Sequence, residues 1–210
     1  MPPTSHQFFH FTPVMMKNIK EAATCGGFDK DGVNEFSYVS TIDAITALFT
    51  VLMSTACELR RKCRLQRRRR KLARRLRESI IQSDEIFLRD AINFLAEHSN
   101  AGCVQLSNNF LFGPDLVFSS WVHLGMYNAE FDGTHPWYAS FPRMTCYDGR
   151  VIITEAQKGG EGIDVGVFLV SKAMEKLKKM FSEVSYLYER PILVMMKYKI
   201  ENVSAIASLL

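Results

Sequence analysis

The sequence lacks any apolar run long enough to cross a membrane. The longest candidate, residues 192–196, is far shorter than the roughly 18 residues that a spanning helix requires. The first residues carry neither a basic stretch nor an apolar core, so we expect no secretory signal. We therefore expect a cytoplasmic protein with no membrane partner.

Paired cysteines and clustered metal ligands are also missing. The five cysteines are odd in number and include no Cys-x-x-Cys pair: Cys25, Cys57, Cys63, Cys103 and Cys146. This arrangement favours reduced thiols over a disulfide framework or a zinc site. His6 and His10 have the spacing of metal ligands on a helix, but the residues around them favour a strand, so we expect no metal site.

Acidic residues are absent from the most basic part of the chain. Of the 26 Lys and Arg, twelve lie within residues 60–77, which leaves 14 against 22 Asp and Glu elsewhere. The chain is thus an acidic body interrupted by one basic run. A solvated helix is the simplest interpretation of that run. The alternative is a non-enzymatic protein that binds nucleic acid or an acidic partner through it, with strong salt dependence and no sequence preference.

What is present indicates an α/β protein. With 210 residues, 47% hydrophobic and 23% charged, the chain can bury a real core. A strand is predicted at residues 8–11, and Thr12 followed by Pro13 predicts the start of a helix. Ser40 and Asp43 have the form of a capping box and predict a second helix.

Two further helices follow in the sequence pattern. Apolar spacing predicts that the second half of the basic run is helical as far as Ile81. Residues 83–85 then predict the cap of another helix. Its apolar residues are expected to face inward: Phe87 or Leu88, Ala91, Ile92 and Leu95.

The second half of the chain reads as strands that end in a helix. Residues 117–123 alternate so that Ser119, Trp121 and His123 share one face of a strand, with Ser120 on the other. Residues 137–144 and 149–155 predict a hairpin, and residues 163–169 a further strand. Ser171 is expected to cap the last long helix, and residues 192–200 are compatible with an added strand.

The order of these motifs resembles the C-terminal half of the plant acyl-CoA-dependent acyltransferases called the BAHD family. Ser-Ser-Trp at 119–121 is followed by Tyr-x-x-Glu-Phe-x-Gly, a hairpin, Gly-x-Asp-Val and a helix. An earlier stretch, Phe-Thr-Pro at 11–13 with Thr-Ile-Asp-Ala-Ile-Thr-Ala-Leu at 41–48, is similar to the same family in the right order. The family hallmark Asp-Phe-Gly-Trp-Gly is represented by a partial match: Glu130, Phe131, Asp132, Gly133 and Thr134.

The resemblance implies a fold, a domain division and an activity. The fold would be α/β, a mixed sheet with flanking helices, about half of the two-domain chloramphenicol-acetyltransferase-like fold. A C-terminal-type domain would span residues 1–184, with a deletion near 62–71 and an unassigned tail at 185–210. The activity would move an acyl group, for example hydroxycinnamoyl, from acyl-CoA as co-substrate to a small alcohol or amine in plant secondary metabolism. We expect a monomer without a bound cofactor.

The residues that would catalyse this reaction are not found. Members of the family use the histidine of His-x-x-x-Asp as the general base, and none of the five histidines here has an aspartate four residues later. His123 is the one histidine beside the Ser-Ser-Trp strand, but nothing near it in the sequence would orient its ring. We therefore expect the chain to be truncated and inactive alone, with no catalytic residue.

The resemblance does imply contacts with the donor. Ser40, Thr41, Ser119, Ser120 and Trp121 correspond to residues near the channel for coenzyme A and the acyl group. The alternatives are a simple helix cap for Ser40 and a core indole for Trp121. Glu130, Phe131, Asp132 and Gly133 are expected to be structural. Asp132 would disturb a turn there if the position needs a positive φ angle.

Overall fold

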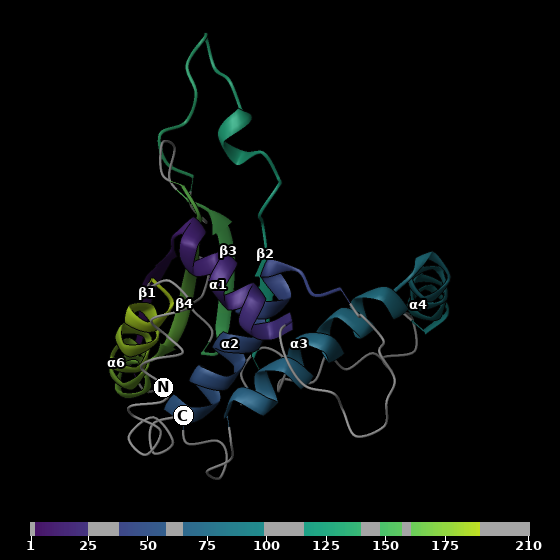
Figure 1. Cartoon of the computed structure of the whole chain (residues 1–210). Coiled ribbons are helices and arrows are strands. Elements are labelled where there is room, and N and C mark those ends of the chain that lie inside the picture. The colour runs from purple at the N-terminus through teal and green to yellow at the C-terminus, as the bar shows by residue number, and fades with distance from the viewer. Residues whose placement is uncertain are drawn as a thin grey trace.

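The computed structural model describes residues 3–24, 38–57, 65–98, 116–139, 148–156 and 161–189. A four-stranded sheet with helices beside it forms the body, and a narrow arm extends from one end of the sheet (Figure 1). Within these ranges, none of the helices combines the length and the apolar composition that crossing a bilayer requires.

The sheet is mixed, as predicted. It consists of β1 (Thr4–Phe11), β2 (Val117–Ser120), β3 (Arg150–Glu155) and β4 (Ile163–Val170), in the spatial order β1-β4-β3-β2. β4 runs antiparallel to both of its neighbours, whereas β2 is parallel to β3. Parallel neighbours need a long crossover connection. The connection from β2 to β3 accordingly spans residues 121–149, and β2 forms the edge of the sheet opposite β1.

The core lies between one face of the sheet and the helices α1 (Pro13–Thr24), α2 (Thr41–Ala56) and α6 (Ser171–Tyr188). Phe9 and Phe11 of β1 place their rings 4.8 Å and 5.3 Å from the ring of Phe181 on α6, in edge-to-face packing. α1 begins as predicted, because the Thr12 hydroxyl accepts a hydrogen bond from the Met15 N–H. The prediction that Ser171 caps α6 is wrong, because Ser171 is the first residue of the helix and its hydroxyl donates to the Pro3 carbonyl.

α3 (Leu65–Gln82) and α4 (Glu85–His98) extend away from the sheet (Figure 1). α3 lies along α2, where Ala73 is completely buried. The prediction that the apolar residues of α4 face inward is wrong, because Phe87, Leu88, Ile92 and Leu95 are 56%, 54%, 65% and 49% exposed. Periodicity predicts that a helix is amphipathic, but it carries no information about which element covers the apolar face.

Two other expectations are only partly resolved. The second strand of the predicted hairpin is confirmed as β3, but its pairing is wrong, because β3 pairs with β4 and β2 and residues 137–139 form no strand. Residues 140–147 and the possible strand at 192–200 lie outside the described residues. Every cysteine except Cys57 also lies outside the described residues. Cys57 is a free thiol, and its pKa is raised by burial and by the nearby Asp148 carboxylate.

Candidate functional site

The end of β2 brings together two of the residues singled out by sequence. The Trp121 backbone N–H donates to the Ile153 carbonyl at 2.7 Å, so the pairing with β3 continues one residue beyond the strand. The Trp121 indole N–H donates to the Ser119 hydroxyl oxygen at 2.9 Å. Both side chains are half-buried and lie on the face of the sheet opposite the helices. Ser120 points to the other face, as the alternation predicts.

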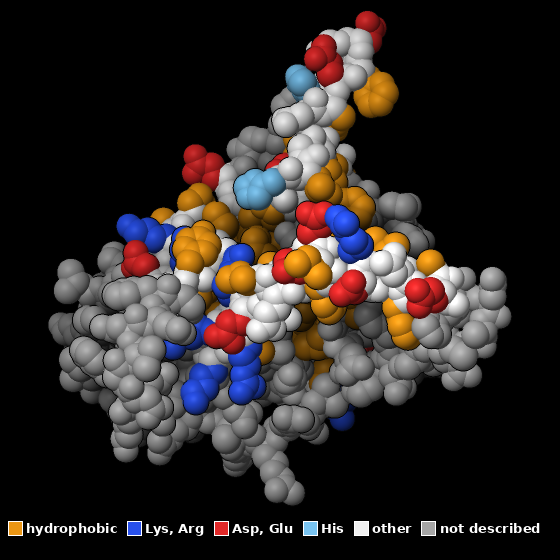
Figure 2. Space-filling view, turned by 90° about the vertical axis from the view of Figure 1, so that its right-hand side faces the viewer, with side chains coloured by type: hydrophobic (Ala, Val, Ile, Leu, Met, Phe, Trp, Pro, Cys, Tyr) orange, Lys and Arg blue, Asp and Glu red, His pale blue; other side chains and the backbone are white. Residues whose placement is uncertain are grey.

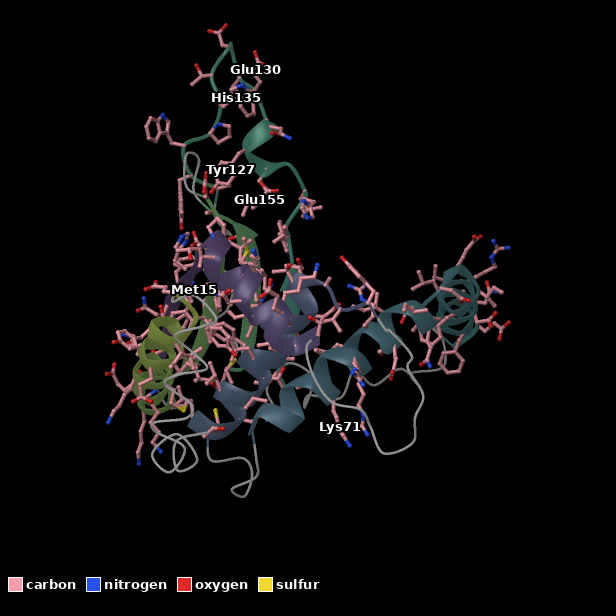
Figure 3. The ribbon with its side chains drawn as sticks, in the orientation of Figure 1. Met15, Lys71, Tyr127, Glu130, His135 and Glu155 are labelled. Carbon is pink, nitrogen blue, oxygen red and sulfur yellow. The ribbon has the colours of Figure 1, made fainter. Side chains whose placement is uncertain are left out.

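His123 does not share that face, contrary to the prediction. Its φ angle is 71°, which breaks the strand alternation, and its backbone N–H donates to the Glu155 carboxylate at 2.9 Å. Glu155 thus holds the chain where it leaves the sheet and enters the arm (Figure 3). The bond joins residues 32 positions apart, so sequence alone offered no signal for it.

A polar row crosses the face of the sheet that carries Trp121. The strand registers place His10, Asp164 and Thr154 side by side, with Trp121 next in line. His10 Nδ1 lies 2.8 Å from Asp164 Oδ1, so a carboxylate orients this imidazole. Sequence reasoning missed the pair because its members are 154 residues apart. Four residues from His10 along β1, His6 stacks on Phe168, and burial lowers the pKa of this imidazole.

The N-terminus of α2 holds the other predicted contact residues. Ser40 is the N-cap, and its hydroxyl accepts the Asp43 N–H at 3.1 Å, while the Asp43 carboxylate accepts the Ser40 N–H at 2.8 Å. This confirms the predicted capping box. Thr41 is the first helical residue and is half-buried. The proposed role of Ser40 and Thr41 as coenzyme A contacts stays a prediction.

A buried ion pair adjoins this cap. The Arg77 guanidinium of α3 donates to Asp43 Oδ2 from Nη2 at 2.6 Å and from Nε at 2.8 Å, and the Asp43 side chain is only 2% exposed. Arg77 also lies over the Tyr38 ring, as does the Lys20 ammonium group, at 5.5 Å and 5.1 Å from the ring centroid. For Arg77, then, the interpretation of the basic run as a solvated face is wrong.

We expect Asp43→Ala to lower the free energy of unfolding by about 3 kcal/mol, because it removes the cap and leaves the Arg77 charge partly buried without this carboxylate. Urea denaturation followed by circular dichroism measures the loss. The matched control is Glu85→Ala, which removes an exposed pair with Arg89 on α4 and should cost less than about 0.5 kcal/mol. Equal losses in the two variants would contradict the role given to Asp43.

The expected structural motif forms a tight turn at the tip of the arm. Phe131 and Thr134 exchange both backbone hydrogen bonds at 2.9 Å, and Asp132 and Gly133 between them have φ angles of 51° and 73°. The position of Asp132 does require a positive φ, yet the turn is made, since aspartate tolerates this conformation better than most residues. Glu130 and His135 flank the turn, away from the sheet (Figure 3).

The sequence-predicted residues therefore fall into three places: the end of β2, the cap of α2 and the tip of the arm. The structure links Ser119 with Trp121 and Ser40 with Asp43. Among the described residues, no three His, Cys, Asp or Glu side chains are grouped so that they could hold a metal ion. The function of these three groups of residues is inferred from the proteins that the chain resembles.

Comparison with known proteins gives a consistent answer. The chain matches the model of the family described as "Transferase family" over residues 47–184. Hydroxycinnamoyltransferase 2 of Oryza sativa subsp. japonica is 23% identical over 105 residues, which is 50% of this chain and 24% of that protein.

Solved structures are similar as well. TRI101 of F. sporotrichioides, complexed with coenzyme A and T-2, has a TM-score of 0.65 and 19% identity over 85% of this chain and 49% of its own. TRI101 of F. graminearum, complexed with coenzyme A and deoxynivalenol, has a TM-score of 0.60 and 17% identity over 85% and 48%. These matches confirm the predicted fold, about half of a chloramphenicol-acetyltransferase-like structure. The chain spans only half the length of the solved relatives, and less of the rice protein.

Proposed function

Because the chain belongs to the Transferase family, the BAHD-type acyltransferases, we propose that it is one half of an enzyme that moves an acyl group from acyl-CoA to a small alcohol or amine. The family match over residues 47–184 is the observation that carries this proposal. The name of the rice relative supports a hydroxycinnamoyl donor, and the coenzyme A in both TRI101 complexes supports the thioester. We place the activity in plant secondary metabolism and in the cytoplasm.

The geometry at β2 suits the carbonyl end of the donor. The Trp121 indole occupies one acceptor position of the Ser119 hydroxyl, and this leaves the Ser119 proton to donate elsewhere. When an alcohol or amine attacks a thioester, the carbonyl oxygen gains negative charge. A fixed hydrogen-bond donor beside that oxygen stabilises the charge most strongly at that moment. We assign the role of this hydrogen-bond donor to Ser119, with Trp121 as the residue that orients its hydroxyl group.

The cap of α2 suits the opposite end of the donor. Ser40 can still donate its hydroxyl proton while its oxygen accepts the Asp43 N–H. Tyr38 is 66% exposed and has the cations of Lys20 and Arg77 over its ring. An aromatic surface with adjacent positive charge fits the base and phosphates of coenzyme A. The Thr41 hydroxyl would add a contact to the same group.

We infer that the general base comes from outside the described residues. His10, oriented by Asp164, has the geometry of such a base, but it lies on β1. Three strand spacings of about 4.8 Å each separate β1 from β2. A general base must lie within hydrogen-bond reach of the acceptor whose proton it takes. His10 therefore cannot act as the base for an alcohol or amine placed beside Ser119. This supports the proposal that the chain is one half of an enzyme.

Binding of the donor can be tested on the chain as it is. Trp137→Phe leaves Trp121 as the single tryptophan, so titration with acetyl-CoA should change its fluorescence in a saturable way. Ser119→Ala should weaken this binding about two- to tenfold, the worth of one hydrogen bond. The neighbouring Ser120→Ala, on the opposite face, should have a smaller effect. If acetyl-CoA leaves the fluorescence unchanged up to millimolar concentration, Ser119 and Trp121 are not donor contacts.

The alternative function, a non-enzymatic protein that binds nucleic acid or an acidic partner through residues 60–77, gains no specific support. Side chains before Lys71 lie outside the described residues, and Arg77 is already paired with Asp43. The exposed cations of α3 nevertheless need an explanation.

A further inference from the structure

We propose that α3 and α4 together bind the surface of an anionic lipid membrane. In this arrangement the apolar side of α4 enters the boundary between headgroups and acyl chains, and the basic side of α3 lies against the headgroups. The proposal does not depend on the acyltransferase assignment. It concerns surface binding only, since none of the described helices is long and apolar enough to span a membrane.

The first observation is an exposed apolar face on α4. Phe87, Leu88, Ile92 and Leu95, here called the α4 apolar face, are all about half exposed or more. At 100° per residue they occupy an arc of about 140° on one side of the helix. Arg89, Asp90 and Glu97 lie on the other side, together with the exposed Ile86, and Glu85 lies at the border beside Ile92. An amphipathic helix of this kind can lie in the plane of a membrane interface.

The second observation is the placement of charge on the adjoining helix. Leu72, Ala73 and Leu76 of α3 pack toward α2, and the exposed Lys71 and Arg75 lie on the other side. Lys71 extends from α3 away from the sheet (Figure 3). α3 carries further basic residues at 67–70 and no acid before Glu78. Each Lys or Arg near an anionic membrane strengthens binding about fivefold.

A lipid surface is the partner that accounts for both features at once. Figure 2 looks onto this end of the molecule, where hydrophobic side chains lie at the surface among charged ones. Nucleic acid would use the cations of α3 but leave the α4 apolar face in water. A second copy would cover the apolar face but would bring equal basic charges together. Asp90 and Glu97 of α4 are compatible with an anionic membrane, because they lie on the side of the helix turned toward water. Glu85, at the border, is paired with Arg89.

The test is co-sedimentation of the full chain with vesicles of phosphatidylcholine, with and without phosphatidylserine. We expect binding only to the anionic vesicles, decreasing as salt rises. Lys71→Ala with Arg75→Ala should weaken binding about 25-fold. Leu88→Gln and Ile92→Gln should each weaken it at least about tenfold. Arg89→Ala is the control, because it removes one positive charge from the side of α4 turned away from the membrane, and it should bind like the parent chain.

Three outcomes would overturn the proposal. The first is equal binding to neutral and anionic vesicles, or none to either. The second is self-association, or a complex with the N-terminal half of the rice Hydroxycinnamoyltransferase 2, that Leu88→Gln abolishes in analytical ultracentrifugation. Either result would assign the α4 apolar face to a protein partner. The third is binding to mixed-sequence RNA, but not to vesicles, that depends on Lys71 and Arg75 alone. All substituted residues are exposed, and circular dichroism will verify that each variant is folded.

Discussion

Purified alone and supplied with an acyl-CoA and a panel of alcohols and amines, the chain is expected to release no thiol above the uncatalysed rate. None of its five histidines belongs to a His-x-x-x-Asp motif, and the one histidine–carboxylate pair among the described residues, His10 with Asp164, lies too far from Ser119. General-base assistance contributes roughly 10² to 10⁴ in rate. Loss of the acceptor's positioning would lower the rate further. Thiol release measured with a chromogenic disulfide reports the turnover directly.

The complementary experiment supplies the missing part in trans. The N-terminal half of the rice Hydroxycinnamoyltransferase 2, which the resemblance predicts to carry the base, is mixed or co-expressed with this chain. Thiol release that needs both polypeptides would identify the chain as a detached half-enzyme. Turnover at ordinary enzyme rates by the chain alone, surviving substitution of all five histidines, would show that the argument about the missing base is wrong.

Replacing Gly162 by alanine is expected to lower the free energy of unfolding by about 3 to 5 kcal/mol, at the upper end for a single substitution. Gly162 precedes β4 with a φ angle of 112°, and a Cβ atom there would lie 2.0 Å from the Phe11 carbonyl oxygen. Phe11 is completely buried and paired with Ile163, so its backbone cannot move aside without disturbing the β1–β4 pairing. Chemical denaturation followed by circular dichroism measures the change.

Gly133→Ala is the matched control for this effect. Gly133 also has a positive φ, 73°, but no atom lies within 4 Å of the added Cβ. The substitution should therefore cost only the conformational strain, about 1 to 2 kcal/mol, within a turn on the arm. If Gly162→Ala and Gly133→Ala lose the same stability, the close approach of Phe11 is not what makes Gly162 necessary.

Much of the fold was predictable because its signals are local. A capping box depends on residues three apart, so Ser40 and Asp43 marked the start of α2 in the sequence itself. The same is true of Thr12 and Pro13 at α1 and of the alternation that separates Ser119 from Ser120. The order of these local motifs sufficed to identify the family and the mixed α/β sheet.

What only the tertiary structure decided are pairings between residues far apart in the chain. Asp43 meets Arg77, and His10 meets Asp164, because helix packing and strand register bring them together; neither depends on sequence spacing. The exposure of the α4 apolar face was undecidable for the same reason. An amphipathic pattern records that one side of a helix avoids water in its functional state, whereas the surface that covers that side belongs to another element, molecule or membrane.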